Sequence, residues 1–239
     1  MTTPIEPVEI PPALLGESSR RRAMLRRAAM RAKLIVSELG PKVRRTFDVV
    51  LSALALAALS PLFIAVAIAI KIQDRGPILF KQERIGRGGK RFMLFKFRTM
   101  VHGADAMKTA LAAANPEAMS GVRFKLTQDP RVTRVGRILR RFSIDEMPQI
   151  YNVLRGDMTL VGPRPPVWRE VALYSPKALR RLEVTPGLTC LWQIGGRSDL
   201  TFEQQVDLDL EYIDKVQPAE EVAIVVKTIP AVISGRGAY

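Results

Sequence analysis

An uninterrupted apolar segment from Val49 to Ile70 constrains this chain more than any other feature. The segment, VVLSALALAALSPLFIAVAIAI, holds no charged side chain, and as a helix rising about 1.5 Å per residue it would be about 33 Å long. That length reaches across the hydrocarbon core of a bilayer, so we expect a membrane helix. A buried core helix is the alternative, although core helices rarely stay apolar on every side for this length. A cleaved signal peptide fits badly, because the run is too long and starts too far along the chain.

A Ser60-Pro61 pair in the middle of this segment predicts a bend, because proline removes a backbone hydrogen bond and kinks a helix. Both flanks are basic, whereas lysine and arginine favour the cytoplasmic side, so a straight span would place one basic flank outside. A helix that enters, bends at Ser60-Pro61 and returns to the same face satisfies both flanks. An ordinary kinked span is the alternative, since proline is tolerated in spanning helices. The basic residues nearest the segment are Lys42, Arg44 and Arg45 before it and Lys71, Arg75 and Lys81 after it.

The rest of the chain is arranged around this helix. Residues 1–19 are rich in proline without an apolar period, which predicts a disordered tail. Residues 20–46 predict a basic juxtamembrane helix, residues 47–72 the re-entrant membrane helix, and residues 73–239 a cytoplasmic catalytic domain. We expect an α+β fold that is mostly helical.

Local patterns predict the elements of the catalytic domain. Two alternating stretches, PILFKQERIG and KRFMLFKFRTM, are separated by Arg87-Gly88-Gly89 and predict a short β-hairpin. Apolar residues at helical spacing predict helices near residues 107–119, 144–154, 167–182 and 202–216. The last apolar stretch, residues 219–233, could lie against the membrane or against the core.

Composition narrows the chemistry. The chain has 239 residues, which suits one main domain with a real core, and a formal net charge of +14, which favours an anionic partner. Nucleic acid, an anionic membrane surface and a phosphate-bearing substrate all satisfy that charge. Cys190 is the only cysteine and His102 the only histidine, so neither a His/Cys zinc cluster nor a Ser-His-Asp triad can be assembled. Catalysis therefore has to rest on carboxylates, Lys, Arg, Tyr, Ser or a metal held by oxygen.

Two adjacent carboxylates in SIDEMPQ (residues 143–149) are the first candidates for catalysis. Ser143 and Glu146 have the spacing of a capping box, so a plain helix start is one interpretation. An N-cap nearer Asp145 suits Pro148 better, because the proline then falls among naturally unpaired positions. Either choice puts both carboxylates at a helix N-terminus, which would keep Asp145 ionised, as a nucleophile toward phosphorus must be. Adjacent side chains do not share a helix face, so Asp145 would attack while Glu146 holds a divalent metal.

Basic side chains near the hairpin are candidates for binding phosphate. Lys96 and Arg98 would share one face of a strand. Together with Arg140 and Arg141 they could line a pocket for a pyrophosphate. The alternative is an edge strand that is guarded by charge.

Two further arginines lie in loops. Prolines on both sides stiffen the loop that carries Arg164, which suits a guanidinium that must meet an anion in fixed geometry. An exposed arginine on a rigid turn has the same pattern. Arg197 follows Gly195-Gly196, which permits close backbone approach to a ligand or marks a simple turn.

In their order and spacing these motifs resemble the bacterial sugar transferases, the polyprenyl-phosphate phosphoglycosyltransferases of the monotopic class. The match covers about Lys42 to the C-terminus, and the combination is far more specific than any single motif. Residues 226–232 (VKTIPAV) are similar to members that start exopolysaccharide synthesis, whereas Cys190 stands where many members have glycine. The motifs are, in chain order, Ser60-Pro61, KFRTM (96–100), DPR (129–131), SIDEMPQ (143–149), GPRP (162–165), and PGLT (186–189) leading to Gly196-Arg197.

The resemblance implies a re-entrant membrane helix and a reaction in two steps. Asp145 would attack the sugar-proximal phosphorus of a UDP-sugar and release UMP, and a polyprenyl phosphate would then take the phospho-sugar from the aspartyl intermediate. Glu146 would help to bind Mg²⁺, which offsets charge on phosphoryl oxygens. The side chains that would share this task are Lys96, Arg140, Arg164 and Arg197.

The resemblance also implies the partners and the location. The products would be undecaprenyl-diphospho-sugar and UMP, made from a hexose-1-phosphate donor, with glucose or galactose expected, as the first membrane step of exopolysaccharide synthesis. The protein would lie in the bacterial inner membrane, on an anionic lipid surface, with its catalytic domain on the cytoplasmic side. No nucleic acid is expected as a partner. A homo-oligomer is compatible with the sequence.

Two other functions are open at the level of the residues alone. A membrane-tethered scaffold or nucleic-acid-binding protein would use the basic helix of residues 20–46 and would show salt-sensitive binding. A metal-dependent sugar transferase would release UDP instead of UMP.

Overall fold

The computed structural model describes residues 17–114, 119–120, 123–124, 129–195, 200–215 and 218–234. The chain divides into two compact units, Met1–Thr46 and Phe47–Tyr239. The described residues are mostly helical and contain a small antiparallel hairpin, so the predicted α+β class is confirmed. Of the predicted N-terminal tail, residues 1–16 lie outside the described residues.

Helix α1 (Glu17–Asp74) contains the whole apolar segment. Among the described residues, its part from Gly40 to Asp74 is the one helix long and apolar enough to cross a membrane. Only 11% of its most apolar stretch is buried. A core helix would be mostly covered, so the core-helix alternative is excluded.

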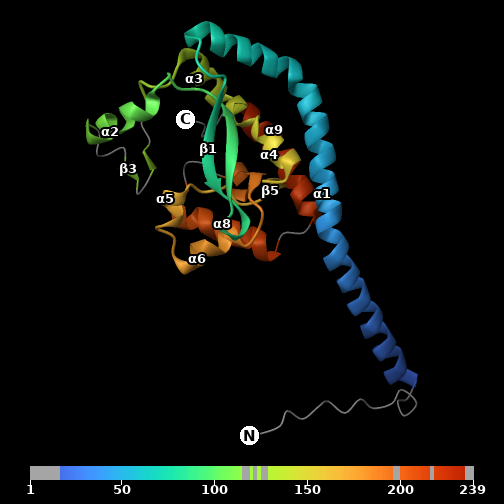
Figure 1. The fold of residues 1–239 in the computed structure, drawn as a ribbon. Helices are drawn as coiled ribbons and strands as arrows, with labels where there is room; N and C mark the ends of the chain where they lie inside the picture. Colours follow the sequence, from blue (N-terminus) through green and yellow to red (C-terminus); the bar gives the residue numbers. More distant parts are fainter. Residues whose placement is uncertain are drawn as a thin grey trace. The chain divides into compact units, whose positions relative to one another are not determined.

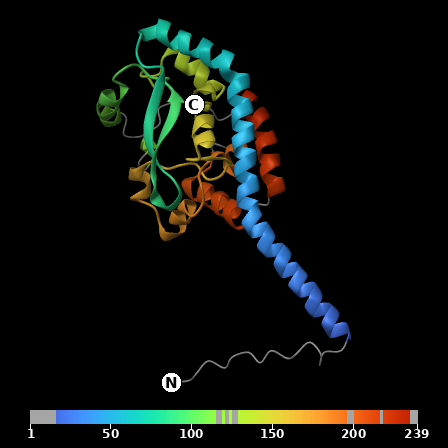
Figure 2. The ribbon, with the colours of Figure 1, turned by 45° about the vertical axis from the view of Figure 1, so that its right-hand side comes forward.

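Helix α1 does not end at the Ser60-Pro61 pair. The helix is continuous through both residues, and Figures 1 and 2 show it bending in its blue-green part. Pro61 has no N–H to offer the carbonyl of Ala57, four residues earlier. The Ser60 hydroxyl donates a hydrogen bond of 2.8 Å to that same carbonyl. The serine therefore satisfies the acceptor that the proline leaves without its helical partner.

The predicted hairpin is confirmed. Strands β1 (Leu79–Ile85) and β2 (Arg91–Phe97) pair antiparallel in a register that joins Leu79 to Phe97 and Ile85 to Arg91. The turn η2 (Arg87–Gly89) contains Gly88 at φ 64°, a left-handed conformation that glycine adopts without strain. The hairpin carries Lys96 near the end of β2.

Prolines divide two of the predicted helices. The stretch 144–154 forms the 3-10 turn η4 (Ile144–Glu146) and helix α4 (Gln149–Arg155), with Pro148 at the junction. The stretch 167–182 forms the short helices α5 (Trp168–Val171) and α6 (Pro176–Leu179) and the turn η5 (Arg180–Leu182). Ser175 is extended because it precedes a proline, and its side chain caps α6 by accepting from the Ala178 N–H.

The remaining elements complete the part of the chain that follows α1, residues 75–239, which we call the catalytic unit. Strands β5 and β6 pair in parallel, and β3 pairs with β4 antiparallel. Helix α8 follows the predicted range closely. The elements are α2 (Ala104–Ala114), β3 (Met119–Ser120), β4 (Arg123–Phe124), α3 (Arg134–Arg141), β5 (Thr159–Val161), β6 (Gly187–Thr189), α7 (Leu191–Gly195), α8 (Phe202–Lys215) and α9 (Pro218–Ser234).

Among the described residues, three apolar clusters hold these elements together, and the smallest joins α6 to α8 through Ala178 and Val206. The largest one joins the hairpin, α4, β5, α8 and α9, and Leu51 of α1 packs against it. The second joins the part of α1 beyond the bend to β2 and α3, through Val66, Ile70, Phe97 and Leu139. Residues on both sides of the bend are therefore packed on the same catalytic unit.

The last apolar stretch, which could lie against the membrane or against the core, forms helix α9, and the two faces of this helix differ in burial. Ile224 is buried in the largest cluster, whereas Val222 and Val226 are exposed. One face thus packs on the core, and the other leaves apolar side chains uncovered.

Candidate active site

A cavity of about 1300 Å³ opens between α1, the hairpin, η4, β6 and α9. The structure brings six predicted site residues to its wall, from four separate parts of the chain. Arg141 is exposed and does not line the cavity, and Arg197 lies outside the described residues. The six are Lys96, Arg98, Arg140, Asp145, Glu146 and Arg164.

The two carboxylates lie on the 3-10 turn η4 and not at the start of a longer helix. Ser143 precedes the turn with a φ of 52°, a left-handed conformation, and its side chain makes no capping hydrogen bond. Neither helix start that the sequence offers is confirmed, because Ser143 forms no capping box and no longer helix begins near Asp145. Helix α4 begins after Pro148, which stands at its N-cap position. The turn, fixed by its own backbone bonds, presents Asp145 and Glu146 to the cavity.

The two neighbouring carboxylates differ in their pKa values. Burial raises the pKa of Asp145 to about 6, and the adjacent Glu146 carboxylate adds to this effect while Lys96 and Arg140 oppose it. The Lys96 ammonium lowers the pKa of Glu146 to about 2 against the cost of burial, with help from Arg164. The sequence predicts that a helix dipole keeps Asp145 ionised; the structure instead gives Asp145 a raised pKa. At neutral pH both groups are ionised, and Asp145 is the more basic of the two.

Lys96 fixes Glu146 directly. Its Nζ atom donates to Glu146 Oε1 at 2.5 Å, and the two side chains are 17% and 28% exposed. A hydrogen bond between two ionised groups that are partly buried is shorter and stronger than one between neutral groups. This ion pair distinguishes the two carboxylates. Glu146 is paired with Lys96, and Asp145 is the candidate nucleophile of the turn.

Arg164 is held on a stiff loop between two strands, as the flanking prolines predict. The carbonyls of Pro165 and Pro166 accept hydrogen bonds from Arg84 Nη1 and from the Ile85 N–H, at 3.0 and 2.9 Å. On the other side of the loop, Gly187 donates its N–H to the Pro163 carbonyl at 2.9 Å. The loop is therefore anchored to β1 and β6, which places Arg164 on the cavity wall.

Arg140 enters the cavity from the end of α3. Its Nε atom donates to Thr99 Oγ1 at 2.9 Å. Burial lowers its pKa, while the Asp145 carboxylate opposes that effect. Lys96, Arg140 and Arg164 thus bring positive charge to the cavity that holds Asp145, as the sequence predicts.

The DPR motif has a structural part in this arrangement. Arg131 is 5% exposed and bonds both oxygens of Asp129, and this contact lowers the pKa of Asp129. The Arg131 carbonyl accepts from the Val101 N–H at 2.9 Å. The motif therefore fixes the loop that follows β2, and that loop forms one rim of the cavity.

Part of the cavity wall is apolar and comes from the apolar segment of α1. Leu51, Ala55 and Leu59 of α1 line it, together with Leu188 of β6 and Val225 of α9. A cavity with cations at one part and aliphatic side chains at another suits a ligand that has a phosphate and a hydrocarbon chain.

The donor set fits a magnesium ion that is shared with a substrate. Within the described ranges, no three His, Cys, Asp or Glu side chains come together. Mg²⁺ does not need such a cage, because it commonly uses one or two carboxylates and completes its shell with substrate phosphates and water. Glu146 is ionised at neutral pH and lines the cavity, so it can supply the protein ligand.

The sequence did not single out three residues that the structure places at or behind the cavity. Asp48 is 4% exposed and accepts from Thr159 Oγ1 at 2.7 Å and from the Leu160 N–H at 3.1 Å. Thr99 bonds Arg140, and Gln193 lines the cavity. An acid beside a long apolar run is a signal that could have marked Asp48, whereas nothing local marks its partners far along the chain. Trp192 is buried at 6% exposure and also lines the cavity.

Comparisons with known proteins identify the family. Residues 40–235 match the model of the bacterial sugar transferase family. The exopolysaccharide production protein ExoY of Sinorhizobium fredii is 44% identical over 206 residues, which cover 85% of this chain and 91% of that protein. The undecaprenyl-phosphate galactose phosphotransferase of Salmonella typhimurium is 41% identical over 199 residues, covering 82% of this chain and 42% of that protein.

A third relative is the UDP-glucose:undecaprenyl-phosphate glucose-1-phosphate transferase of Caulobacter vibrioides. It is 41% identical over 204 residues, which cover 82% of this chain and 72% of that protein. The family model spans all of the site motifs that the structure describes. This chain belongs to the bacterial sugar transferase family.

Proposed function

We propose that the protein transfers a hexose-1-phosphate from a UDP-sugar to undecaprenyl phosphate through a covalent intermediate on Asp145. The enzyme class, a polyprenyl-phosphate sugar-1-phosphate transferase, follows from the family and from relatives that are named for this activity. The products are undecaprenyl-diphospho-sugar and UMP. This reaction is the first membrane step of exopolysaccharide synthesis, in line with the name of the ExoY relative.

The observation that carries the proposal is that the surroundings of two adjacent carboxylates give them different pKa values. Asp145 has a pKa of about 6 and Glu146 a pKa of about 2, on one turn of the cavity wall. A carboxylate that is ionised at neutral pH and yet more basic than usual is a better nucleophile than an ordinary one. The neighbouring cations can offset the charge that builds on the phosphoryl oxygens.

In the first step an oxygen of Asp145 attacks the phosphorus next to the sugar. The bond from that phosphorus to the bridging oxygen breaks, and UMP leaves with the electron pair. Lys96, Arg140 and Arg164 line the cavity and hold the negatively charged oxygens. Glu146 would hold Mg²⁺, which would neutralise further charge on the phosphoryl oxygens.

In the second step an oxygen of undecaprenyl phosphate attacks the same phosphorus. The bond to the aspartyl oxygen breaks, and the carboxylate of Asp145 is restored without net proton transfer. Leu51, Ala55 and Leu59 of α1 offer an apolar path for the first prenyl units, because they line the same cavity as the carboxylates. UMP leaves before the lipid reacts, so one phosphate region serves both substrates.

The membrane helix is re-entrant in this proposal, with the catalytic unit at the cytoplasmic face of the inner membrane. Asp48, before the apolar segment, bonds Thr159 and Leu160, and Asp74, after it, forms an ion pair with Arg98. Both ends of the segment are thus tied to one catalytic unit. A straight crossing would carry the second end to the far side of the membrane. Exposed apolar residues on the outer face, such as Leu54, Ile64 and Ile68, would contact lipid.

The nucleotide released tests this function. Detergent-solubilised protein is incubated with labelled UDP-glucose or UDP-galactose, Mg²⁺ and undecaprenyl phosphate, and nucleotide and lipid products are separated. We expect UMP and a labelled diphospholipid from one of the two sugars, and no turnover from Asp145→Asn. UDP as the product, or full turnover by Asp145→Asn, would refute the mechanism.

A further inference from the structure

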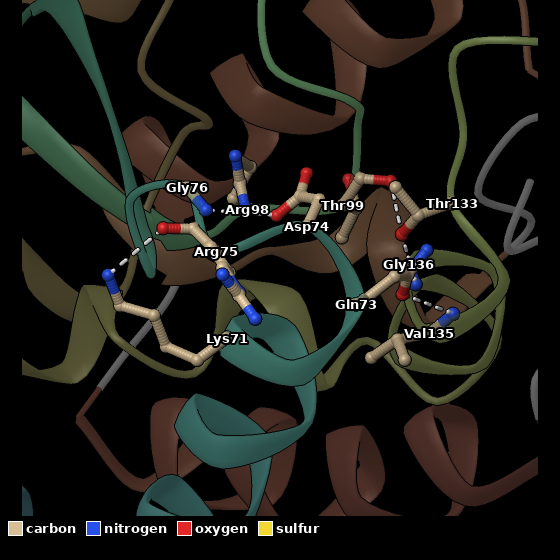
Figure 3. Close-up of polar contacts among 10 residues, drawn as sticks. All are labelled: Lys71, Gln73, Asp74, Arg75, Gly76, Arg98, Thr99, Thr133, Val135 and Gly136. Atoms are coloured by element: carbon tan, nitrogen blue, oxygen red, sulfur yellow. Dashed lines mark hydrogen bonds and ion pairs between the residues drawn. The ribbon is translucent and has the colours of Figure 1, made fainter.

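Thr99 lies two residues after the end of β2, between the end of α1 and the start of α3 (Figure 3). Its side chain is 7% exposed and lines the cavity wall. Two sets of contacts fix its backbone, one on the side of α1 and one on the side of α3. No part of the two-step reaction described above makes use of its hydroxyl.

The residue before Thr99 is tied to the end of the membrane helix. Arg98 forms an ion pair with Asp74, whose carboxylate also accepts from the Gly76 N–H at 3.2 Å. The Arg98 N–H donates to the Ile78 carbonyl at 2.9 Å. A Cβ atom at Gly76 would lie 2.0 Å from the Arg98 guanidinium, so glycine leaves the room that this ion pair needs. Figure 3 shows Asp74, Gly76 and Arg98 gathered at this point.

The carbonyl of Thr99 is held by the start of α3. Thr133, the N-cap of α3, donates to it from the backbone N–H at 3.0 Å and from the hydroxyl at 3.3 Å. Gly136 packs so closely that a Cβ atom there would lie 2.0 Å from the Thr99 oxygen. Gln73 of α1 accepts from the Val135 N–H at 3.2 Å, which ties the start of α3 to the end of α1 as well.

With its backbone fixed from two sides, Thr99 presents Oγ1 as an acceptor to Arg140 Nε at 2.9 Å. We propose that Thr99 is a positioning residue, which holds the Arg140 guanidinium toward the phosphoryl group that Asp145 attacks. The inference rests on the proposed function. It adds that the end of the membrane helix, through Asp74 and Gln73, sets the position of a cation in the active site.

The geometry gives Thr99 more than a packing role. A guanidinium carries its N–H donors in one plane, so a bond at Nε fixes that plane and leaves the terminal amino groups for another partner. Without the bond, a long arginine side chain regains rotamer freedom, and its mean position relative to Asp145 changes. Errors of about 1 Å in such a group cost roughly 100-fold in rate.

The test compares Thr99→Val with Thr99→Ser. Valine keeps the shape but removes the acceptor, whereas serine keeps the acceptor and removes only a methyl group. We expect kcat to fall roughly 10- to 100-fold in Thr99→Val with a smaller change in KM for the UDP-sugar, and to stay within about threefold of wild type in Thr99→Ser.

A double-mutant cycle with Arg140→Met separates positioning from general damage. If Thr99 acts through Arg140, adding Thr99→Val to Arg140→Met causes little further loss, whereas independent effects would multiply. Multiplying effects, an unchanged kcat in Thr99→Val, or an equal loss in Thr99→Ser would overturn the inference. Asp145→Asn is assayed in parallel: if it turns over normally, the proposed function fails, and if it is inactive while Thr99→Val is normal, only the inference fails.

Discussion

At the scale of single residues, the site depends on the different pKa values of two adjacent carboxylates on one turn. The sequence singles out Asp145 and Glu146 and predicts that they differ in role, because neighbouring side chains do not share a face. It could not predict the reason, since Lys96, which bonds Glu146, comes from a strand fifty residues earlier. The sequence around Ser143 is typical of a helix cap, so it could not predict the left-handed conformation of this residue.

The acid limb of the pH profile reports the ionisation of Asp145. Its pKa is raised to about 6 by burial, so the fraction of ionised nucleophile, and with it kcat/KM, should fall as the pH drops through about 6. Glu146, with a pKa of about 2, stays ionised over that range. Initial rates between pH 5 and pH 8 measure this limb. A rate that stays constant down to pH 5 would contradict the raised pKa.

Asp145→Asn should stabilise the fold at neutral pH while it abolishes turnover. The pKa of Asp145 is raised on folding, from 3.8 to about 6, so the stability that its protonated form contributes is lost as the pH rises toward and beyond 6. Asparagine cannot ionise and escapes that loss. We expect a melting temperature several degrees above wild type at pH 7.5, and a smaller difference at pH 5. A variant that melts below wild type at both pH values would contradict this.

At the scale of elements, the sequence predicts those whose signals are local. The hairpin follows from alternation around Arg87-Gly88-Gly89, and α8 from its apolar period. The helices predicted near 144–154 and 167–182 fail where Pro148 and Pro176 fall inside the pattern. The parallel pairing of β5 with β6 joins short strands distant in the chain, and no local pattern could predict it.

The start of the apolar segment is fixed to β5 by one buried carboxylate. Asp48→Leu removes both acceptors and leaves the Leu160 N–H and the Thr159 hydroxyl without this partner. We expect a loss of about 2–4 kcal/mol in stability, measured as a drop in melting temperature in detergent. Asp207→Asn, at an exposed ion pair with Lys177, is the matched control and should change little. Equal effects of the two variants would show that the hydrogen bonds of Asp48 to β5 do not stabilise the fold.

At the scale of the whole molecule, the relation of the chain to the membrane follows from contacts as well as hydropathy. The sequence predicts a bend at Ser60-Pro61 and a return to the same face from the basic flanks. The structure adds the bonds of Asp48 and Asp74 to one catalytic unit, which a charge argument could not supply. Residues such as Arg197 lie outside the described ranges, so their part in the site stays a prediction.

Cysteine labelling tests the re-entrant geometry. Cys190 is the only cysteine and is buried, so cysteines introduced at Val43 and Ile72, both exposed, can be followed singly. A membrane-impermeant maleimide should label neither position in intact spheroplasts and both after lysis. Wild-type chain, carrying buried Cys190 alone, is the background control. Labelling of exactly one position in intact spheroplasts would indicate a straight crossing.

Mass spectrometry of the protein, after incubation with the donor and Mg²⁺ and without lipid acceptor, tests whether a covalent phospho-sugar forms on Asp145. We expect the peptide containing Asp145 to gain the mass of one hexose phosphate and to lose it when undecaprenyl phosphate is added. Asp145→Asn should gain nothing. Full turnover without any adduct on that peptide, or an adduct on a different residue, would rule out Asp145 as the nucleophile.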